Sequence, residues 1–199
     1  MQLRAPAILL AARQHGETAV VARFLTEEYG LIAGYVAGGR GRNLRPVVIP
    51  GNAVEVQLSA KSDSQLPFAK VELTQSRGAW LGEPLPAAAI SWVCALTATA
   101  LPERQPYASL YEALGGTLDA ICNAPSARGW ASALVGYEAL LLRELGYGGA
   151  GGRPEGDLAQ IIEVMDELAE PLDHYLLADR RGDVMAARTR LRDLLGRMV

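Results

Sequence analysis

Apolar residues follow two different spacings along the chain, and the change comes near residue 78. Before it, residues 54–61 and 69–74 alternate apolar and polar side chains, which is typical of antiparallel strands with one face in water. Three earlier apolar runs, 7–12, 19–25 and 31–37, are also strand-like and are separated by turn-forming residues. Five short strands with glycines at the turns predict a small closed barrel such as the OB-fold.

After residue 78 the apolar spacing becomes helical. Residues 87–101 have no polar face and predict a buried helix, and the next helix is expected at 107–121. Later apolar stripes predict helices near 130–145, with Ser126 as N-cap, near 158–168 and near 184–198. We therefore expect an α+β protein, with an N-terminal OB-fold β-barrel at 1–78 and an all-α helical domain at 79–199. The glycine-rich segment 146–156 is expected to be a flexible linker.

Charge is distributed unevenly over the 199 residues, whose formal net charge is −3. Residues 1–78 carry a net charge of +3 and residues 79–199 carry −6. Such an asymmetry indicates a module that binds a polyanion. Aromatic residues make up only 6% of the chain, which argues against a surface built from stacked aromatic platforms.

The segment that says most about chemistry is 38–46, Gly-Gly-Arg-Gly-Arg-Asn-Leu-Arg-Pro. Glycine lets backbone N–H groups approach an anion, and the guanidinium group of arginine matches phosphate geometry. A loop of this kind between barrel strands favours contact with the sugar-phosphate backbone of DNA or RNA, without base recognition. The alternative is that the loop is merely solvated and that the weaker candidates named below are ordinary surface charges. The predicted DNA contacts are Arg40, Arg42 and Arg45, with Arg13, Arg23, Lys61 and Lys70 as weaker candidates.

No catalytic or cofactor-binding signature is found in the sequence. A lysine-containing phosphate loop is missing, and His15 and His174 stand in no nucleophile or metal-binding pattern. Cys94 and Cys122 lie in apolar stretches and are too few for a disulfide framework or a zinc site. The start resembles no signal peptide, and the longest apolar stretch, 87–101, is short for a membrane span. We therefore expect a cytoplasmic protein that is no enzyme and uses neither metal nor cofactor.

The last predicted helix is rich in arginine. These residues form either a second surface for DNA or a partner, or a solvated face that complements the C-terminal end of the helix. Asp183, in the sequence Arg181-Gly182-Asp183, is interpreted as the cap of this helix. The arginines concerned are Arg180, Arg181, Arg188, Arg190, Arg192 and Arg197.

Several segments resemble one protein family, in order and at compatible spacing. They are Arg-Gln-His-Gly-Glu-Thr at 13–18, Phe-Leu-Thr-Glu-Glu-Tyr-Gly-Leu-Ile at 24–32, the arginine segment at 38–46, and Leu-Leu-Leu-Arg-Glu-Leu-Gly-Tyr at 140–147. Together they are similar to the DNA repair protein RecO family. The resemblance covers essentially the whole chain, and it is specific over residues 8–52 and 137–147.

This resemblance implies an N-terminal OB-fold and a helical C-terminal domain. It implies a recombination mediator that binds single- and double-stranded DNA, anneals complementary strands and works with RecR at the nucleoid. It also implies contact with the single-stranded DNA-binding protein and, indirectly, loading of RecA onto the strands which that protein coats. The alternative is an OB-fold adaptor that mainly contacts protein or RNA.

Two details of the helical domain bear on this resemblance. The acidic, apolar tail of the single-stranded DNA-binding protein needs an apolar groove with a cation at its rim. Trp92, Trp130 and Tyr137 beside Arg143 are candidates for it, although such aromatics usually form core.

Many relatives carry a cysteine zinc site after the Leu-Gly-Tyr phrase, but residues 148–153 contain neither cysteine nor histidine. We expect no zinc there, and a segment that is braced in another way or is looser.

Overall fold

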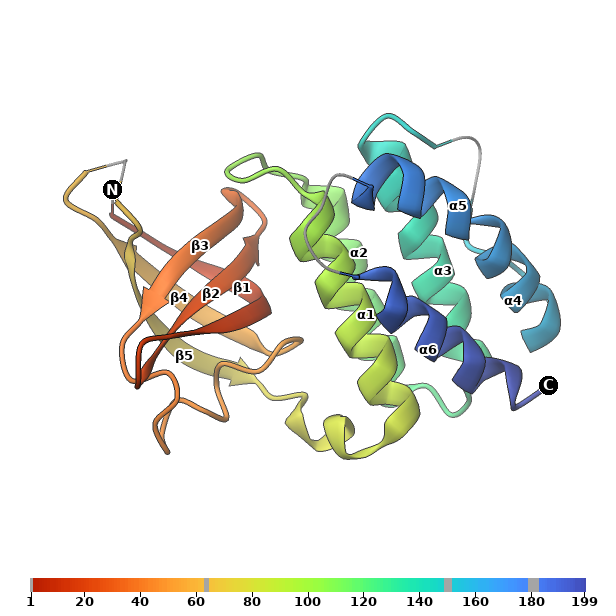
Figure 1. Ribbon diagram of the computed structural model, residues 1–199, viewed down its shortest axis with the longest axis horizontal. Coiled ribbons are helices and arrows are strands. Elements are labelled where there is room, and N and C mark those ends of the chain that lie inside the picture. Colours follow the sequence, from red (N-terminus) through yellow and green to blue (C-terminus); the bar gives the residue numbers. More distant parts are fainter. Residues whose placement is uncertain (1, 63–64, 149–151, 179–182) are drawn as a thin grey trace. The chain divides into compact units, whose positions relative to one another are not determined.

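The computed structural model describes residues 2–62, 65–148, 152–178 and 183–199. The chain divides into two compact units. One comprises Met1–Gly82 together with Leu101–Ala108, and the other Glu83–Ala100 together with Ser109–Val199. The first contains a β-barrel and the second contains helices (Figure 1). The predicted α+β class, with the strands first and the helices after them, is confirmed.

The barrel is closed, with its five strands in the spatial order β1-β2-β3-β5-β4. Neighbouring strands are antiparallel, except that β3 and β5 run parallel. The long first strand pairs with both β2 and β4, and a register shift between Leu9 and Ala11 bends it between them. The strands are β1 (Gln2–His15), β2 (Ala19–Thr26), β3 (Gly30–Val36), β4 (Ala53–Ser59) and β5 (Phe68–Gln75).

Strict alternation along the strands fills the barrel. On β4, Val54, Val56 and Leu58 are buried in the core cluster, whereas Gln57 and Ser59 are exposed. Burial of these apolar side chains provides the main stabilisation of the unit. On β4 the outward positions include the charged Glu55 and the polar Gln57 and Ser59, whereas Ile8, Leu10, Leu25 and Leu31 of the other strands are buried outside this core cluster.

Residues 101–108, between the first two helices, form part of the barrel unit. The backbone N–H of Arg104 donates to the carbonyl oxygen of Leu31 at 2.9 Å. Gly30, at the β2–β3 turn, has φ of +67°, and a Cβ placed there would overlap the carbonyl oxygen of Gln105. Glycine is therefore required at position 30 both by its backbone conformation and by this close approach.

Gly30→Ala is expected to destabilise the barrel more than Gly16→Ala does. Gly16 also has a positive φ, of +63°, but a Cβ there meets nothing within 4 Å. Gly16→Ala therefore costs only the left-handed conformation, about 1–2 kcal/mol, while Gly30→Ala adds the clash with residue 105. Urea unfolding followed by circular dichroism measures both. Equal midpoints for the two variants would contradict the packing of residues 101–108 on the barrel.

The helical unit is built around α1, whose side chains are buried along most of its length, as predicted. In this unit α1 packs on α6 and α3 packs on α4. Ser126 is the N-cap of α3, but its side chain makes no capping hydrogen bond. The helices are α1 (Pro84–Ala100), α2 (Ala108–Asn123), α3 (Ala127–Glu144), α4 (Leu158–Glu167), α5 (Ala169–Pro171) and α6 (Met185–Gly196), with 3-10 and π-helical turns at Gly78–Gly82 and Leu172–Leu177.

A buried ion pair ties these helices together. Glu138 on α3 is fully buried, and Arg188 on α6 donates to its two carboxylate oxygens at 3.0 and 2.7 Å. Trp92 of α1 donates its indole N–H to the same carboxylate at 2.6 Å, and Arg188 also reaches the carbonyl oxygen of Met165 on α4. Four helices thus meet at one carboxylate–guanidinium pair. The sequence placed Arg188 on a surface, and the structure corrects this, because its charge is paired inside the unit.

The other arginines of α6 remain at the surface, where Arg192 donates to both oxygens of Asp166 at 2.9 and 2.6 Å. Its guanidinium group holds the pKa of Asp166 below the usual carboxyl range. Asp183 accepts a hydrogen bond from the N–H of Ala186 at 2.9 Å, which supports its role at the start of the helix. Arg180 and Arg181 lie outside the described residues.

Candidate nucleic-acid interface

The arginine loop, residues 37–52, joins β3 to β4 and begins with a tight turn. Gly38 adopts φ of +66°, and the N–H of Gly41 donates to its carbonyl oxygen at 2.8 Å. Gly39 lies against Val20, so that an added Cβ would come within 2.6 Å of a methyl group. The first glycines are therefore needed to build the turn, and not only to admit an anion.

The second half of the arginine loop is attached to the barrel. Val48 is buried in the core cluster. Asn52, also fully buried, donates its side-chain N–H groups to the carbonyl oxygens of Pro46 and Val47, both at 3.0 Å. Its side-chain oxygen accepts the backbone N–H of Arg77 at 2.8 Å. The loop is thus held in place, and no sequence pattern marks Asn52 as the residue that holds it.

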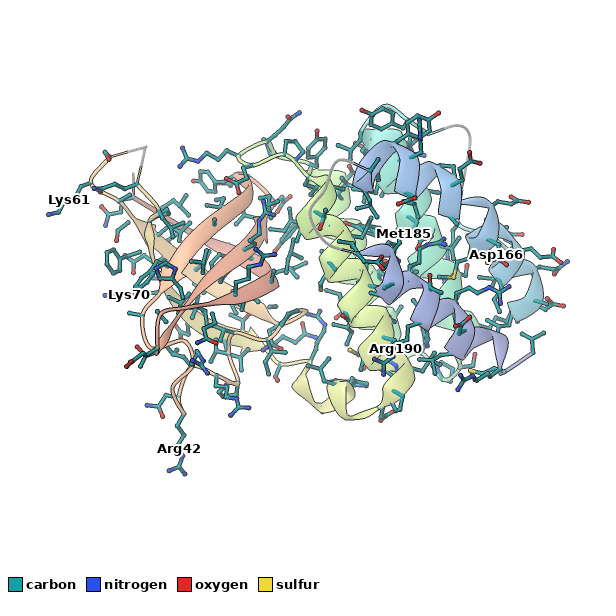
Figure 2. All side chains as sticks on the ribbon, in the orientation of Figure 1. Arg42, Lys61, Lys70, Asp166, Met185 and Arg190 are labelled. Carbon is teal, nitrogen blue, oxygen red and sulfur yellow. The ribbon has the colours of Figure 1, made fainter. Side chains whose placement is uncertain are left out.

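The three arginines of the loop are exposed. Arg40 is held at the β1–β2 turn, where its backbone N–H donates to Thr18 at 2.9 Å and its guanidinium to the carbonyl oxygen of Glu17 at 2.8 Å. In the part of the chain that the structure describes, no hydrogen bond or ion pair engages the side chains of Arg42 and Arg45. Arg42 points away from the barrel (Figure 2). These guanidinium groups are accessible to phosphate.

The weaker candidates fall into two groups. Arg13 on β1, Lys61 after β4 and Lys70 on β5 are exposed, and Figure 2 shows both lysines projecting from the barrel. Arg23 on β2 instead makes an ion pair with Glu103 at 3.0 Å. This pairing competes with phosphate for the Arg23 guanidinium group.

Two further arginines of this half already have partners within the barrel unit. Arg77 is buried and donates to the carbonyl oxygen of Gly51. Arg4 pairs with Glu55 at 2.7 Å on the outer surface of β1 and β4. The net charge of residues 1–78 therefore overstates the positive charge that is available to a ligand. The accessible part lies on the arginine loop and on the strands next to it.

Comparison with known proteins supplies the family. Residues 1–77 match Recombination protein O N terminal, and residues 83–149 match Recombination protein O C terminal. The chain is 34% identical to the DNA repair protein RecO of Rhodospirillum centenum, over 94% of this chain and 92% of that protein. The chain belongs to the RecO family. Against the RecO proteins of Ruegeria sp. and Rhodospirillum rubrum it is 39% identical, and the matches cover 74% and 71% of this chain but only 61% and 57% of those proteins.

Membership in the RecO family makes this chain a protein of DNA repair and recombination. The N-terminal match coincides with the barrel and its arginine loop, and the C-terminal match includes α1, α2 and α3. No helix in the described ranges is long and apolar enough to cross a membrane.

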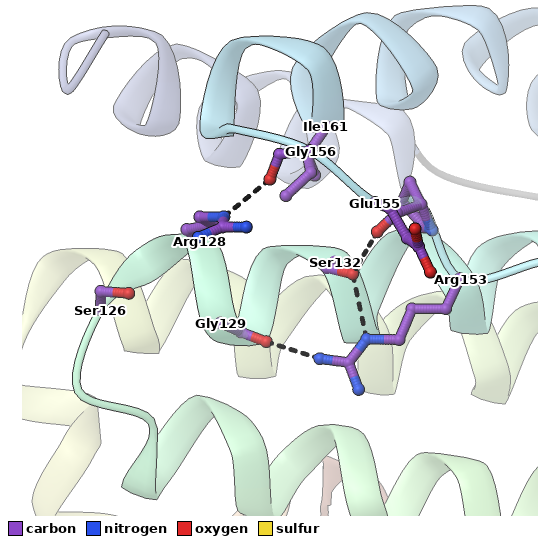
Figure 3. A pocket seen from close by; sticks show the side chains of 9 residues that line it. Ser126, Arg128, Gly129, Ser132, Arg153, Glu155, Gly156 and Ile161 are labelled. Atoms are coloured by element: carbon purple, nitrogen blue, oxygen red, sulfur yellow. Dashed lines mark hydrogen bonds between the residues drawn. The ribbon is translucent and has the colours of Figure 1, made fainter.

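In this RecO chain, hydrogen bonds fix the segment after α3 onto that helix (Figure 3). Arg153 donates to the carbonyl oxygen of Gly129 at 2.9 Å and to the Ser132 hydroxyl at 3.0 Å, and that hydroxyl donates to Pro154 at 2.6 Å. Arg128 donates to Gly156 at 2.7 Å, and a hollow of about 490 Å³ lies among these residues.

These bonds show how the predicted linker is held. Of the predicted linker 146–156, residues 152–156 are braced by arginine, and residues 149–151 lie outside the described residues. Among the described residues, no group of three or more histidine, cysteine, aspartate or glutamate side chains is placed to hold a metal ion.

An apolar groove of about 410 Å³ lies between α2 and α3. Trp92 and Trp130, predicted to wall such a groove, are instead buried core residues. Tyr137 and Arg143 do line it, as predicted, although Tyr137 is almost wholly buried and donates or accepts a hydrogen bond with Thr97 at 2.7 Å. The rest of the lining consists of Ala113, Gly116, Thr117, Ala120, Ala133, Gly136, Leu140, Gly152 and Arg153.

Proposed function

We propose that this RecO chain is a non-enzymatic recombination mediator that binds single- and double-stranded DNA and anneals complementary strands. The observation that carries the proposal is the arginine loop, which is anchored by Asn52 and holds Arg40, Arg42 and Arg45 in solvent. Annealing requires that two polyanions be held close while their repulsion is screened, and arginine–phosphate contacts achieve this by releasing counterions. Such a process uses no catalytic group. Arg13, Lys61 and Lys70 extend the contact, and Arg23 contributes least because Glu103 neutralises it.

We assign DNA binding to the barrel, residues 1–78, and partner contacts to residues 79–199. The partners are RecR, the single-stranded DNA-binding protein and, indirectly, RecA, in the cytoplasm at the nucleoid. The α2–α3 groove supports contact with the single-stranded DNA-binding protein, since its apolar lining includes Arg143 and Arg153. An acidic, apolar tail would place its side chains in the groove and its carboxylates near these arginines.

Annealing of complementary oligonucleotides tests the proposal, first with naked strands and then with strands coated by the single-stranded DNA-binding protein. The chain is expected to accelerate both reactions. Arg143→Glu should anneal naked strands at the normal rate and coated strands several-fold more slowly, because the reversed charge repels the acidic tail. Arg197→Glu makes the same charge change at the end of α6 and serves as the control.

The outcomes separate this function from its alternative. Failure with both naked and coated strands would favour an OB-fold adaptor that mainly contacts protein or RNA. Equal rates for Arg143→Glu and Arg197→Glu on coated strands would contradict the proposed contact between the groove and the single-stranded DNA-binding protein. The assignment of DNA binding to the barrel would be unaffected.

A further inference from the structure

Three aromatic side chains lie in a row on the outer surface of the barrel, although aromatic residues are scarce in the chain. Tyr35 on β3 contacts His15, the last residue of β1, with ring centroids 5.7 Å apart. On its other side it contacts Phe68, the first residue of β5, at 5.3 Å. We call His15, Tyr35 and Phe68 the aromatic row. The low aromatic content argued against such a platform, but β1, β3 and β5 bring three rings together.

Exposure of Phe68 is the unusual feature of the aromatic row. The chain has two phenylalanines: Phe24 is completely buried in the barrel core, and Phe68 is 60% exposed. Exposed apolar rings that gather in one place mark binding surfaces more often than isolated ones do. The two contacts are edge-to-face, with interplanar angles of 87° and 75°, so the rings are fixed against one another before any ligand arrives.

A hollow of about 730 Å³ continues the aromatic row beyond Phe68. Phe68 and Leu66 form apolar parts of its lining, and Lys61 also lines it. The hollow lies where the β4–β5 loop meets the start of β1, and in OB-folds this loop and the β1–β2 loop flank the surface that binds oligonucleotides. An apolar ring can stack on a base while a neighbouring lysine contacts the phosphate of the same nucleotide.

Positive charge accompanies the aromatic row along its length. Arg13 is paired with Val21 across β1 and β2, and Val21 is paired with Tyr35, which places all three at outward positions in register. Lys70 follows Phe68 by two residues on the same face of β5. At the His15 end, Arg40 is bonded to the β1–β2 turn at Glu17. The nearest carboxylates along the chain, Glu17 and Glu72, come after His15 and Lys70 respectively.

We propose that the aromatic row stacks the unpaired bases of single-stranded nucleic acid, with the flanking cations on its phosphates. Bases in a duplex have their faces covered by their neighbours, so only unpaired bases can lie on protein rings. Stacking is tolerant of sequence, because every base has a π-face. This inference rests on the proposed function, since it requires that the barrel bind nucleic acid. It adds the expectation that single strands bind more tightly than duplex.

The test compares three fluorescent oligonucleotides by anisotropy: oligo(dT), an abasic strand with the same number of phosphates, and a duplex. The unaltered chain should bind oligo(dT) about a hundredfold more tightly than the abasic strand, since two stacked bases contribute about tenfold each. The double variant Tyr35→Leu, Phe68→Leu should bind oligo(dT) about a hundredfold more weakly and the abasic strand unchanged. Tyr29→Leu alters an exposed tyrosine at the β2–β3 turn, outside the row, and should change neither. Circular dichroism confirms that each variant is folded.

The result separates two failures. If the unaltered chain binds none of the oligonucleotides, the proposed function falls and this inference with it. If it binds oligo(dT) and the abasic strand equally, DNA binding stands and base stacking is overturned. Base stacking is also overturned if the double variant changes only self-association in sedimentation, since the aromatic row would then be an interface between copies of the chain.

Discussion

Glu138→Ala is expected to lower the free energy of unfolding of the helical unit by about 3–5 kcal/mol, because it leaves the buried Arg188 cation without its counter-charge. The exposed fractions of the two side chains are 0% and 3%, so water does not reach the abandoned guanidinium. The indole N–H of Trp92 loses its acceptor in the same variant. Urea denaturation followed by tryptophan fluorescence reports on this site directly.

Arg192→Ala is the matched control. Arg192 follows Arg188 by one turn of α6 and also makes a bidentate ion pair, with Asp166, but this pair is exposed. Pairs in water contribute little, so its loss should move the unfolding midpoint far less. Combining Glu138→Leu with Arg188→Met should restore much of the stability, because no buried charge then remains unpaired. A midpoint for Glu138→Ala that equals the control would contradict the central role of this pair.

Replacing Arg40, Arg42 and Arg45 by alanine is expected to weaken binding to single-stranded DNA about a hundredfold at 0.1 M salt. It should also reduce the log-log salt slope by about 2, because each lost phosphate contact removes about 0.7 of slope on a single strand. On duplex the reduction approaches about 3. Fluorescence anisotropy titrations across a series of salt concentrations measure both quantities.

Arg190→Ala, Arg192→Ala and Arg197→Ala together remove the same charge from the helical unit. This triple variant should leave the slope unchanged if the barrel alone contacts phosphate. A slope that falls with this control and stays constant with the loop variant would move the DNA site from the arginine loop to α6.

The sequence predicted what depends on local spacing. Alternating residues identified the strands, helical stripes identified the helices, and the glycine–arginine pattern identified an exposed loop. Whether an individual arginine is buried in an ion pair or exposed to a ligand could not be predicted in the same way, because its partner is distant along the chain. Arg188 lies 50 residues from Glu138, and Arg23 lies 80 residues from Glu103.

The aromatic row was hidden for a related reason. Composition counts rings but does not place them, and the three rings of the row come from β1, β3 and β5, which are not consecutive in the sequence; in the barrel β3 pairs with β5, and β2 lies between β1 and β3. Asn52 was equally unmarked, since an asparagine beside Gly51 is typical of an ordinary turn. Its importance comes from burial, which leaves its amide to satisfy backbone groups at Pro46, Val47 and Arg77.

The membership of residues 101–108 in the barrel unit determines how the chain can be dissected. A truncation after Gly82 would remove Glu103, the ion-pair partner of Arg23, and the N–H of Arg104 that bonds to Leu31. Without residues 101–108 the backbone of β3 at Leu31 would lose this pairing and could pair with another chain instead. A barrel produced on its own would therefore need these eight residues, 101–108, joined to it through a new connection.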